Sequence, residues 1–237
     1  MEVSVLYYSK RTTKRIQLYY SGIMTVSKKV LATCQLFLIL LFGFSSTPAS
    51  ALAQAKSKNT SQVFSGTGDS VVTVATVNQP VLVSMTHDGT SNFAVISKTA
   101  SDGYISLLAN TVGIYSGTRF QVLSKKEKLS LFDVSADGNW TITIKPLSAA
   151  TKWNGKSISG SGDTVVKIPK KTKAGNKLGM QFAGTSNFAV ISYSKSGKYL
   201  SLKANEIGDY SGKKTFGSGA TYLGVEAEGT WTLTKSK

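Results

Sequence analysis

The sequence offers few side chains that could act as an acid, a base or a metal ligand. His87 is the only histidine, and Asp88 and Ser91 nearby complete the residue types that nucleophilic catalysis requires. Adjacent residues of an extended strand point to opposite faces, so this spacing does not bring the three groups together. A zinc site would need several histidine or cysteine ligands. We therefore predict no catalytic residue, no metal and no cofactor, and interpret His87 as a surface side chain.

Paired carboxylates, as used in glycoside hydrolysis, are the other chemistry to consider. Two pairs of acids occupy matching positions in the chain, Asp69 with Asp163 and Asp137 with Glu228. Each of these acids stands beside a glycine in an expected turn, where such side chains bond to nearby backbone groups. Turn formation explains them without catalysis. A secreted hydrolase is the least favoured function, and we expect that the protein is not an enzyme.

The matching acids belong to an internal duplication. The segment GTSNFAVIS at 89–97 returns unchanged at 184–192, about 95 residues later. The segment SGTGDSVV at 65–72 returns as SGSGDTVV, and Tyr-Ser-Gly and Gly-x-Trp-Thr motifs follow in the same order in each half. This pattern predicts two copies of one small domain, at 59–147 and 153–237, joined by a short junction.

Within each copy the apolar residues alternate with period two, which is typical of half-buried strands. Val81, Val83 and Met85 form one such series, and Ile105, Leu107 and Ala109 another. The Asp-Gly pair at 137–138 lies between two alternating runs and predicts a tight hairpin, because glycine accepts the positive φ of such turns. Seven or eight short strands without an amphipathic helix indicate an all-β protein of two tandem small antiparallel β-sandwich domains.

A secretory signal peptide is predicted at 24–55. Lys28 and Lys29 precede an apolar stretch of about fifteen residues at 30–44, and small residues lead to a cleavage site after Ala55, with Ala53 and Ala51 as alternatives. The stretch is shorter than the roughly 20 residues of a membrane span. We expect no transmembrane segment after cleavage. Residues 1–23 are interpreted as a wrongly assigned upstream extension.

Cys34 is the only cysteine, and it lies near the beginning of the apolar stretch. A lipid-modified cysteine follows such a stretch, so we do not predict lipidation. The exported chain would then contain neither a disulfide nor a thiol. Small extracellular animal domains usually depend on disulfides, so this composition favours a secreted bacterial protein.

The shared motifs G-x-G-D-x-V-V, S-N-F-x-V, N-x-x-G-x-Y-S-G and G-x-W-x-[IL] occur in both copies. In this order they resemble tandem β-sandwich repeat domains of uncharacterised secreted Gram-positive bacterial proteins. The resemblance covers nearly all of the predicted exported chain. It implies an architecture and an extracellular location, and it implies no catalytic residue and no ligand.

Charge distinguishes the two copies. Residues 59–147 carry six basic and six acidic side chains, whereas residues 153–237 carry thirteen lysines and five acids, a net charge of +8. Because the two copies share one fold, the fold itself does not require this difference in net charge between them. Lysine acts as a mobile point charge and not as a bidentate phosphate ligand, which favours diffuse adhesion to a polyanion over specific nucleic-acid recognition. The predicted polyanion-binding residues are Lys167, Lys170, Lys171, Lys173 and Lys177.

Three aromatic residues are candidates for stacking on a sugar ring, namely Tyr115, Tyr210 and Trp153. The two tyrosines occupy equivalent positions and are interpreted first as core residues. Trp153 has no aromatic counterpart and is interpreted first as filling the contact between domains. The sequence therefore predicts a secreted, non-enzymatic surface protein whose second domain adheres to a cell-wall polyanion. The alternative is a carbohydrate-binding module that recognises a cell-wall polysaccharide.

Overall fold

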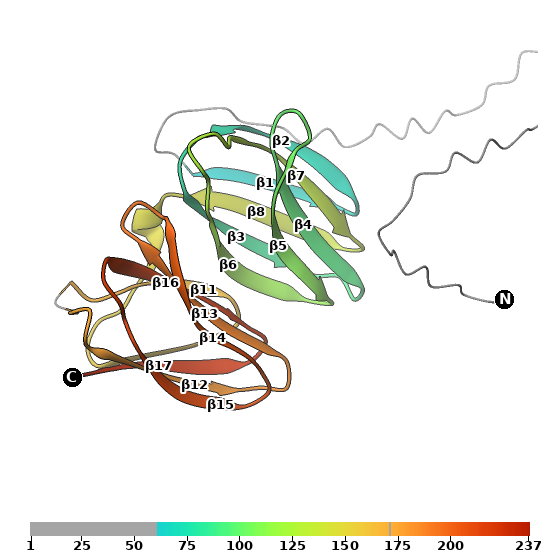
Figure 1. Cartoon of the computed structure of the whole chain (residues 1–237). Helices are drawn as coiled ribbons and strands as arrows, with labels where there is room; N and C mark the ends of the chain where they lie inside the picture. The colour runs from blue at the N-terminus through green and yellow to red at the C-terminus, as the bar shows by residue number, and fades with distance from the viewer. Residues whose placement is uncertain (1–60, 171) are drawn as a thin grey trace, which may run out of the picture. The chain divides into compact units, whose positions relative to one another are not determined.

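The computed structural model describes residues 61–170 and 172–237, which form two successive β-sandwiches (Figure 1). The described part of the chain is all-β, as predicted, and its one helical element is the three-residue 3₁₀ turn η1, Leu147–Ala149. The predicted signal peptide at 24–55 and the extension at 1–23 lie outside the described residues.

The first sandwich consists of two four-stranded antiparallel sheets with the orders β1-β8-β3-β6 and β2-β7-β4-β5. Its strands are β1 Gln62–Thr67, β2 Ser70–Val77, β3 Val81–His87, β4 Asn92–Lys98, β5 Tyr104–Val112, β6 Tyr115–Gln121, β7 Leu129–Ala136 and β8 Asn139–Lys145. Successive strands mostly change sheet, so the inward side chains of both layers share one core.

The second sandwich repeats this arrangement strand for strand. We call β10-β17-β12-β15 its back sheet and β14-β13-β16-β11-β9 its front sheet. Its strands are β9 Thr151–Lys152, β10 Ser157–Ser161, β11 Thr164–Lys167, β12 Lys177–Ala183, β13 Asn187–Ser194, β14 Tyr199–Ile207, β15 Tyr210–Thr215, β16 Ala220–Ala227 and β17 Thr230–Ser236. The short β9 pairs with β11 in parallel, so this front sheet is not purely antiparallel as predicted.

The first glycine of the G-x-G-D motif makes room for a core tryptophan. A Cβ atom on Gly66 would overlap the indole of Trp140, and one on Gly160 would overlap the indole of Trp231. Each indole Nε1 also donates a 2.9 Å hydrogen bond to the carbonyl of the motif's second glycine. The motif therefore serves packing in both copies.

The hairpin predicted at Asp137-Gly138 does not form, because the turn connects β7 to β8 and these two strands belong to different sheets and do not pair. The turn nevertheless requires glycine. Gly138 is not among the glycines with positive φ. Its missing side chain matters because a Cβ atom there would overlap the backbone of Gly89 in the neighbouring turn. Close approach of two turns, and not a left-handed conformation, requires glycine at this position.

A β-bulge corrects the predicted faces of strand β5. The pairing with β4 shifts between Val95, opposite Ala109, and Ile96, opposite Leu107, which leaves Leu108 as the extra residue. Leu108 is buried, whereas Leu107 points to solvent. The simple alternation that placed Leu107 on the same face as Ala109 is wrong, because one inserted residue reverses the faces beyond it.

Candidate functional site

The two sandwiches are joined by an apolar contact. Phe120 of β6 stacks on Tyr193 of β13, with ring centroids 4.2 Å apart and an interplanar angle of 13°. The buried members of this contact are Leu82, Phe120, Ala150, Val165, Tyr193 and Tyr222. The first sandwich therefore covers the part of the front sheet's outer face that carries Val165, Tyr193 and Tyr222.

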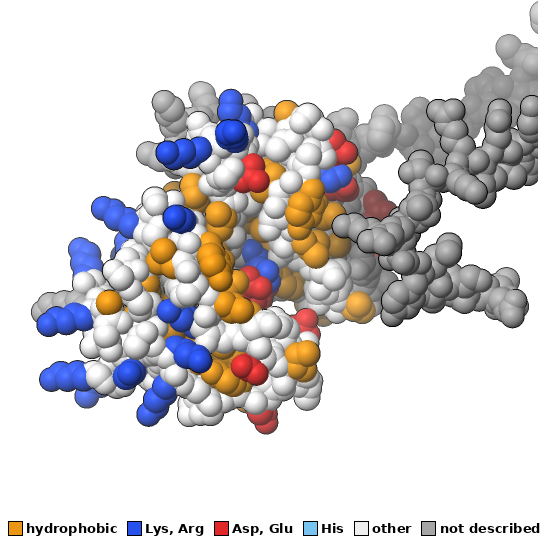
Figure 2. All heavy atoms as spheres, viewed as in Figure 1, with side chains coloured by type: hydrophobic (Ala, Val, Ile, Leu, Met, Phe, Trp, Pro, Cys, Tyr) orange, Lys and Arg blue, Asp and Glu red, His pale blue; other side chains and the backbone are white. Residues whose placement is uncertain are grey.

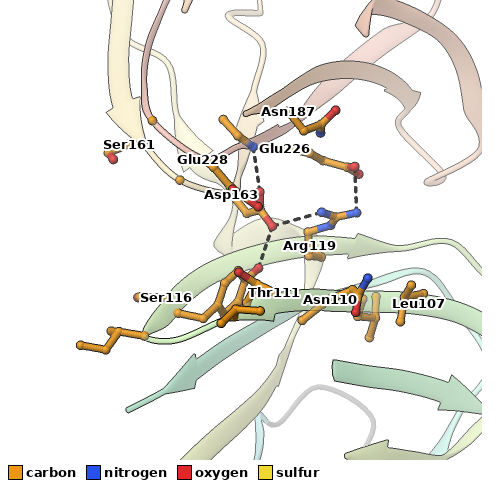
Figure 3. A pocket seen from close by; sticks show the side chains of 18 residues that line it. Leu107, Asn110, Thr111, Ser116, Arg119, Ser161, Asp163, Asn187, Glu226 and Glu228 are labelled. Carbon is orange, nitrogen blue, oxygen red and sulfur yellow. Dashed lines mark hydrogen bonds and ion pairs between the residues drawn. The ribbon is translucent and has the colours of Figure 1, made fainter. Parts of the chain in front are cut away.

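Beside this contact, one arginine of the first sandwich binds two carboxylates of the second (Figure 3). Arg119 Nη1 lies 3.1 Å from Asp163 Oδ2, and Nη2 lies 2.8 Å from Glu226 Oε2. The Tyr115 hydroxyl donates a 2.7 Å hydrogen bond to the same Asp163 oxygen, and the Thr118 backbone N–H donates to the Asp163 carbonyl at 2.9 Å. We call Tyr115, Arg119, Asp163 and Glu226 the Arg119 cluster.

Burial and charge shift the protonation equilibria in the Arg119 cluster. Burial raises the pKa of Tyr115 well above its ordinary range, and the Asp163 carboxylate adds to this effect. Burial also raises the pKa of Glu226, although the guanidinium opposes the rise. Burial alone would lower the pKa of Arg119, but the two carboxylates outweigh it and the net shift is upward. One guanidinium thus serves two carboxylates, and the cluster carries one excess negative charge.

The first copy explains what Asp163 does for the fold. Asp69 Oδ1 accepts a 2.9 Å hydrogen bond from the backbone N–H of Ala136, and Asp163 Oδ1 accepts the same bond from Ala227. One carboxylate oxygen thus supports the turn in each copy, as the sequence predicts. In the second copy alone the other oxygen binds the neighbouring sandwich.

A groove of about 520 Å³ borders the Arg119 cluster, between β5 of the first sandwich and the β16–β17 turn of the second (Figure 3). Its carboxylates at 163 and 226 are already bound by donors. The arrangement fits a structural clasp between sandwiches.

His87 is not the predicted surface side chain, since only 2% of it is exposed. Its ring stacks on Phe93 at 4.6 Å with an interplanar angle of 5°. Nδ1 lies 2.8 Å from the Gly113 carbonyl oxygen, and Nε2 lies 3.2 Å from Asp137 Oδ1. The equivalent Phe182 stacks on Phe188 at 4.8 Å with the same angle. The position requires a flat ring inside the sandwich. The alternating series Val81, Val83 and Met85 continues to residue 87 and places it on the inward face, and the polarity of histidine led to the prediction of a surface side chain.

The two candidate tyrosines are partly buried and pack on core phenylalanines. The Tyr115 ring lies 5.6 Å from that of Phe93, and the Tyr210 ring lies 5.8 Å from that of Phe188. Each ring extends over the glycine two residues later, where a Cβ atom would overlap the hydroxyl. The Tyr-Ser-Gly motif thus makes room for the tyrosine. The Tyr115 hydroxyl is bound by Asp163 and its ring packs on Phe93, and sugar stacking by either tyrosine stays a prediction.

Both interpretations of Trp153 are wrong. The side chain is 2% exposed and belongs to the core of the second sandwich, with its ring 5.9 Å from that of Phe216. It neither fills the contact between the sandwiches nor offers a face to a sugar. Trp153 precedes β10, so the segment that joins the two repeats contributes a side chain to the core of the second sandwich.

The predicted lysine cluster is divided by the fold. Exposed lysines in the β11–β12 loop and at the start of β12 are Lys170, Lys173 and Lys177. Lys167 is half-buried at the end of β11, where its Nζ lies 5.9 Å from the ring centroid of Tyr222. It therefore lies on the front sheet, whereas β12 belongs to the back sheet. Lys171 lies outside the described residues.

Strand pairing gathers other lysines that the linear cluster did not include. In the back sheet, Leu178 is flanked by Lys214 of β15 and Lys235 of β17, and Gly179 lies opposite Lys213. The Lys235 N–H donates to the carbonyl of Lys156 at 2.8 Å. Lys177 and Lys213 share the outward face of the sheet, whereas Lys214 and Lys235 lie opposite the buried Leu178 and reach solvent at the end of the sheet. We define the lysine surface as the end of the second sandwich that carries Lys156, Lys173, Lys177, Lys213, Lys214 and Lys235.

Charge is segregated along the second sandwich. Its five acids lie in the turns at one end of the strands or in the adjoining residues, namely Asp163, Glu206, Asp209, Glu226 and Glu228. Lys156, Lys177 and Lys235 lie at the opposite end, where β10 and β12 begin and β17 finishes. Figure 2 shows Lys and Arg side chains gathered along one side of this sandwich, away from the acids.

The basic partners of the ion pairs in the described ranges are His87, Lys98 and Arg119, all in the first sandwich. Every described lysine of the second sandwich is thus without a carboxylate within 4.0 Å. The surface has an uncompensated positive charge that is available to a partner.

Residues 61–170 and 172–237 show neither a metal-binding cluster nor a membrane-spanning helix. No three His, Cys, Asp or Glu side chains there are grouped as a metal ion would require. The same residues contain no helix that is long and apolar enough to cross a membrane.

No protein-family model and no curated protein matches the chain. A search of solved structures finds similarity to a chain described as the PBSX exported protein XepA. The two are 8% identical, the match covers 77% of this chain and 90% of that chain, and the TM-score is 0.25. A TM-score of this size does not establish a common fold.

Proposed function

We propose that the protein is a secreted, non-enzymatic surface protein whose second sandwich adheres to an anionic polymer of the cell envelope through the lysine surface. The observation that carries the proposal is the unpaired, one-sided positive charge of the second sandwich. Such a surface raises the local concentration of a polyanion and speeds its association.

Comparison with the first sandwich supports this function. Val83 of β3 is flanked by Arg119 and Ile144, whereas its equivalent Leu178 is flanked by two lysines at 214 and 235. Leu82 in the same row is replaced by Lys177. The edge that docks on a protein in the first copy is rich in lysine in the second, so one fold presents two kinds of surface.

The carbohydrate-binding alternative loses its main support. Of its three aromatic candidates, Trp153 is buried and the hydroxyl of Tyr115 is bound within the protein. Tyr210 remains half-buried against Phe188. A sugar-binding platform requires an exposed aromatic face, and these three side chains do not combine to form one.

The test is cosedimentation of the chain with bacterial cell walls at low and high salt, with and without removal of teichoic acid. Replacement of three lysines, Lys177→Gln, Lys213→Gln and Lys214→Gln, is expected to weaken binding at least tenfold at low salt. Binding of the unmodified chain should fall steeply with salt, because binding to a polyanion releases counterions.

The control removes the same charge from the first sandwich, through Lys125→Gln, Lys126→Gln and Lys128→Gln. These three lysines are exposed and outside the lysine surface. If both triple variants bind equally well, net charge alone matters and the lysine surface is not the site. If binding survives high salt, charge is not the mechanism.

A further inference from the structure

The two sandwiches expose apolar side chains at the same positions of an edge strand. Tyr104, Leu107 and Val112 of β5 correspond to Tyr199, Leu202 and Ile207 of β14. All six side chains are between 41% and 84% exposed. Both strands pair with a neighbour on one side only.

The core does not account for these rows, and the contact between the sandwiches accounts for them only in part, because Leu107 and Val112 line grooves beside it. The six residues belong to none of the three core clusters. In the second sandwich Tyr199 lies opposite Tyr193, which Phe120 covers, so the row could be read as the rim of that contact. In the first sandwich Tyr104 lies opposite Lys98 with no such cover, and the apolar row is present nonetheless.

The charges beside the two rows differ. Next to Tyr104, Lys98 Nζ lies 2.7 Å from Asp133 Oδ2 and 3.0 Å from Asp102 Oδ1. The positive charge there is fully compensated. Next to Tyr199, Lys195 and Lys198 are exposed and form no ion pair among the described residues.

From this difference we infer that the start of β14, with Tyr199, Leu200 and Leu202 beside Lys195 and Lys198, binds the surface of an anionic lipid bilayer. Apolar and aromatic side chains flanked by lysines are the composition that favours the boundary between headgroups and acyl chains. Lys195 and Lys198 lie outside the lysine surface, so the inference goes beyond the proposed function and gives the second sandwich a lipid surface as a further anionic partner.

A soluble polyanion would use only half of this surface. Teichoic acid or DNA can neutralise the lysines, but neither offers an apolar phase to bury a tyrosine and two leucines. A bilayer satisfies both requirements. The β5 row, with its lysine already paired, is expected to have little affinity for anionic lipid and provides a control within the same chain.

The experiment is cosedimentation of the chain from residue 56 onward with vesicles of phosphatidylcholine alone or with 30% phosphatidylglycerol. Omitting residues 1–55 removes the apolar stretch at 30–44, which would bind lipid by itself, and all three core clusters are retained. The unmodified chain should bind only the anionic vesicles. The double variant Tyr199→Ser with Leu202→Ser should lower the partition coefficient about tenfold or more.

The matched control is Tyr104→Ser with Leu107→Ser, which should bind anionic vesicles as the unmodified chain does. Equal binding by both double variants, or no binding of the unmodified chain, would overturn the lipid assignment. Cell-wall binding that is lost in the triple lysine variant and unchanged in the β14 variant would retain the proposed function even if the vesicle result rejects lipid as a further partner.

Discussion

The two equivalent aspartates, Asp69 and Asp163, allow the bond between the sandwiches to be measured inside one molecule. Each accepts a 2.9 Å hydrogen bond from a backbone N–H at the end of a distant strand, Ala136 of β7 or Ala227 of β16. Only Asp163 also binds Arg119 and the Tyr115 hydroxyl. We predict that Asp163→Ala costs more stability than Asp69→Ala. The difference between the two variants reports the contribution of the contact between sandwiches, because the turn bond is lost in both.

The size of the difference follows from the groups left behind. The turn bond contributes about 1 kcal/mol in either copy. In Asp163→Ala the buried Tyr115 hydroxyl loses its acceptor, which costs about 1–3 kcal/mol. Arg119 keeps Glu226 as a partner, and removal of the excess negative charge offsets part of the loss. We therefore expect Asp163→Ala to be less stable than Asp69→Ala by about 2 kcal/mol.

Urea denaturation followed by tryptophan fluorescence measures this difference, since each sandwich contains buried tryptophan. The loss in Asp163→Ala should appear together with faster proteolysis in the junction at 146–152, where the released sandwiches would expose the chain. Equal losses in the two variants would refute the reasoning and show that the Arg119 cluster contributes no net stability.

Two other predictions concern buried ionisable groups. His87→Phe should change the free energy of unfolding by no more than about 1 kcal/mol, because Phe182 fills the equivalent place in the second sandwich. His87→Ala removes the ring and should lower the free energy of unfolding by about 3 kcal/mol. Equal losses for the two variants in denaturation would show that the position does not require ring stacking. Burial raises the pKa of Glu226 above its ordinary value of 4.5. Between the ordinary and the raised pKa, the folded state binds more protons than the unfolded state, so the free energy of unfolding falls as the pH rises through that window. Glu226→Gln should lack this fall in denaturation curves measured from pH 4 to 8, and an identical pH dependence in both proteins would contradict the assignment.

Local patterns account for the fold class. Period-two alternation, the Asp-Gly turn and the repeated motifs predict an all-β chain, since strand faces and tight turns depend on residues close in sequence. The duplication also identifies which residues the fold needs. Gly66 and Gly160 recur because each accommodates a tryptophan, and the aspartate of the motif recurs because each closes a turn.

The burial of the candidate site residues was predicted less accurately than the fold class, because for several of them burial depends on contacts with other strands. His87 is polar, and its ring stacks on Phe93 although the alternation of β3 already turns residue 87 inward. Trp153 lies outside any alternating run, and only its packing against Phe216 explains its burial. The bulge at Leu108 reversed the expected faces of β5 and hid the exposed row that β14 shares. One inserted residue has no signature in a period-two pattern.

The sequence by itself determined that two copies of one fold differ in charge, because charge and repetition are properties of residue type and spacing. Only the tertiary structure decided where that charge lies. Antiparallel pairing brought Lys213, Lys214 and Lys235 around the strand that begins at Lys177 and collected the acids at the other end. It also joined Arg119 to Asp163, because strand register and packing between sheets act between residues far apart in the chain.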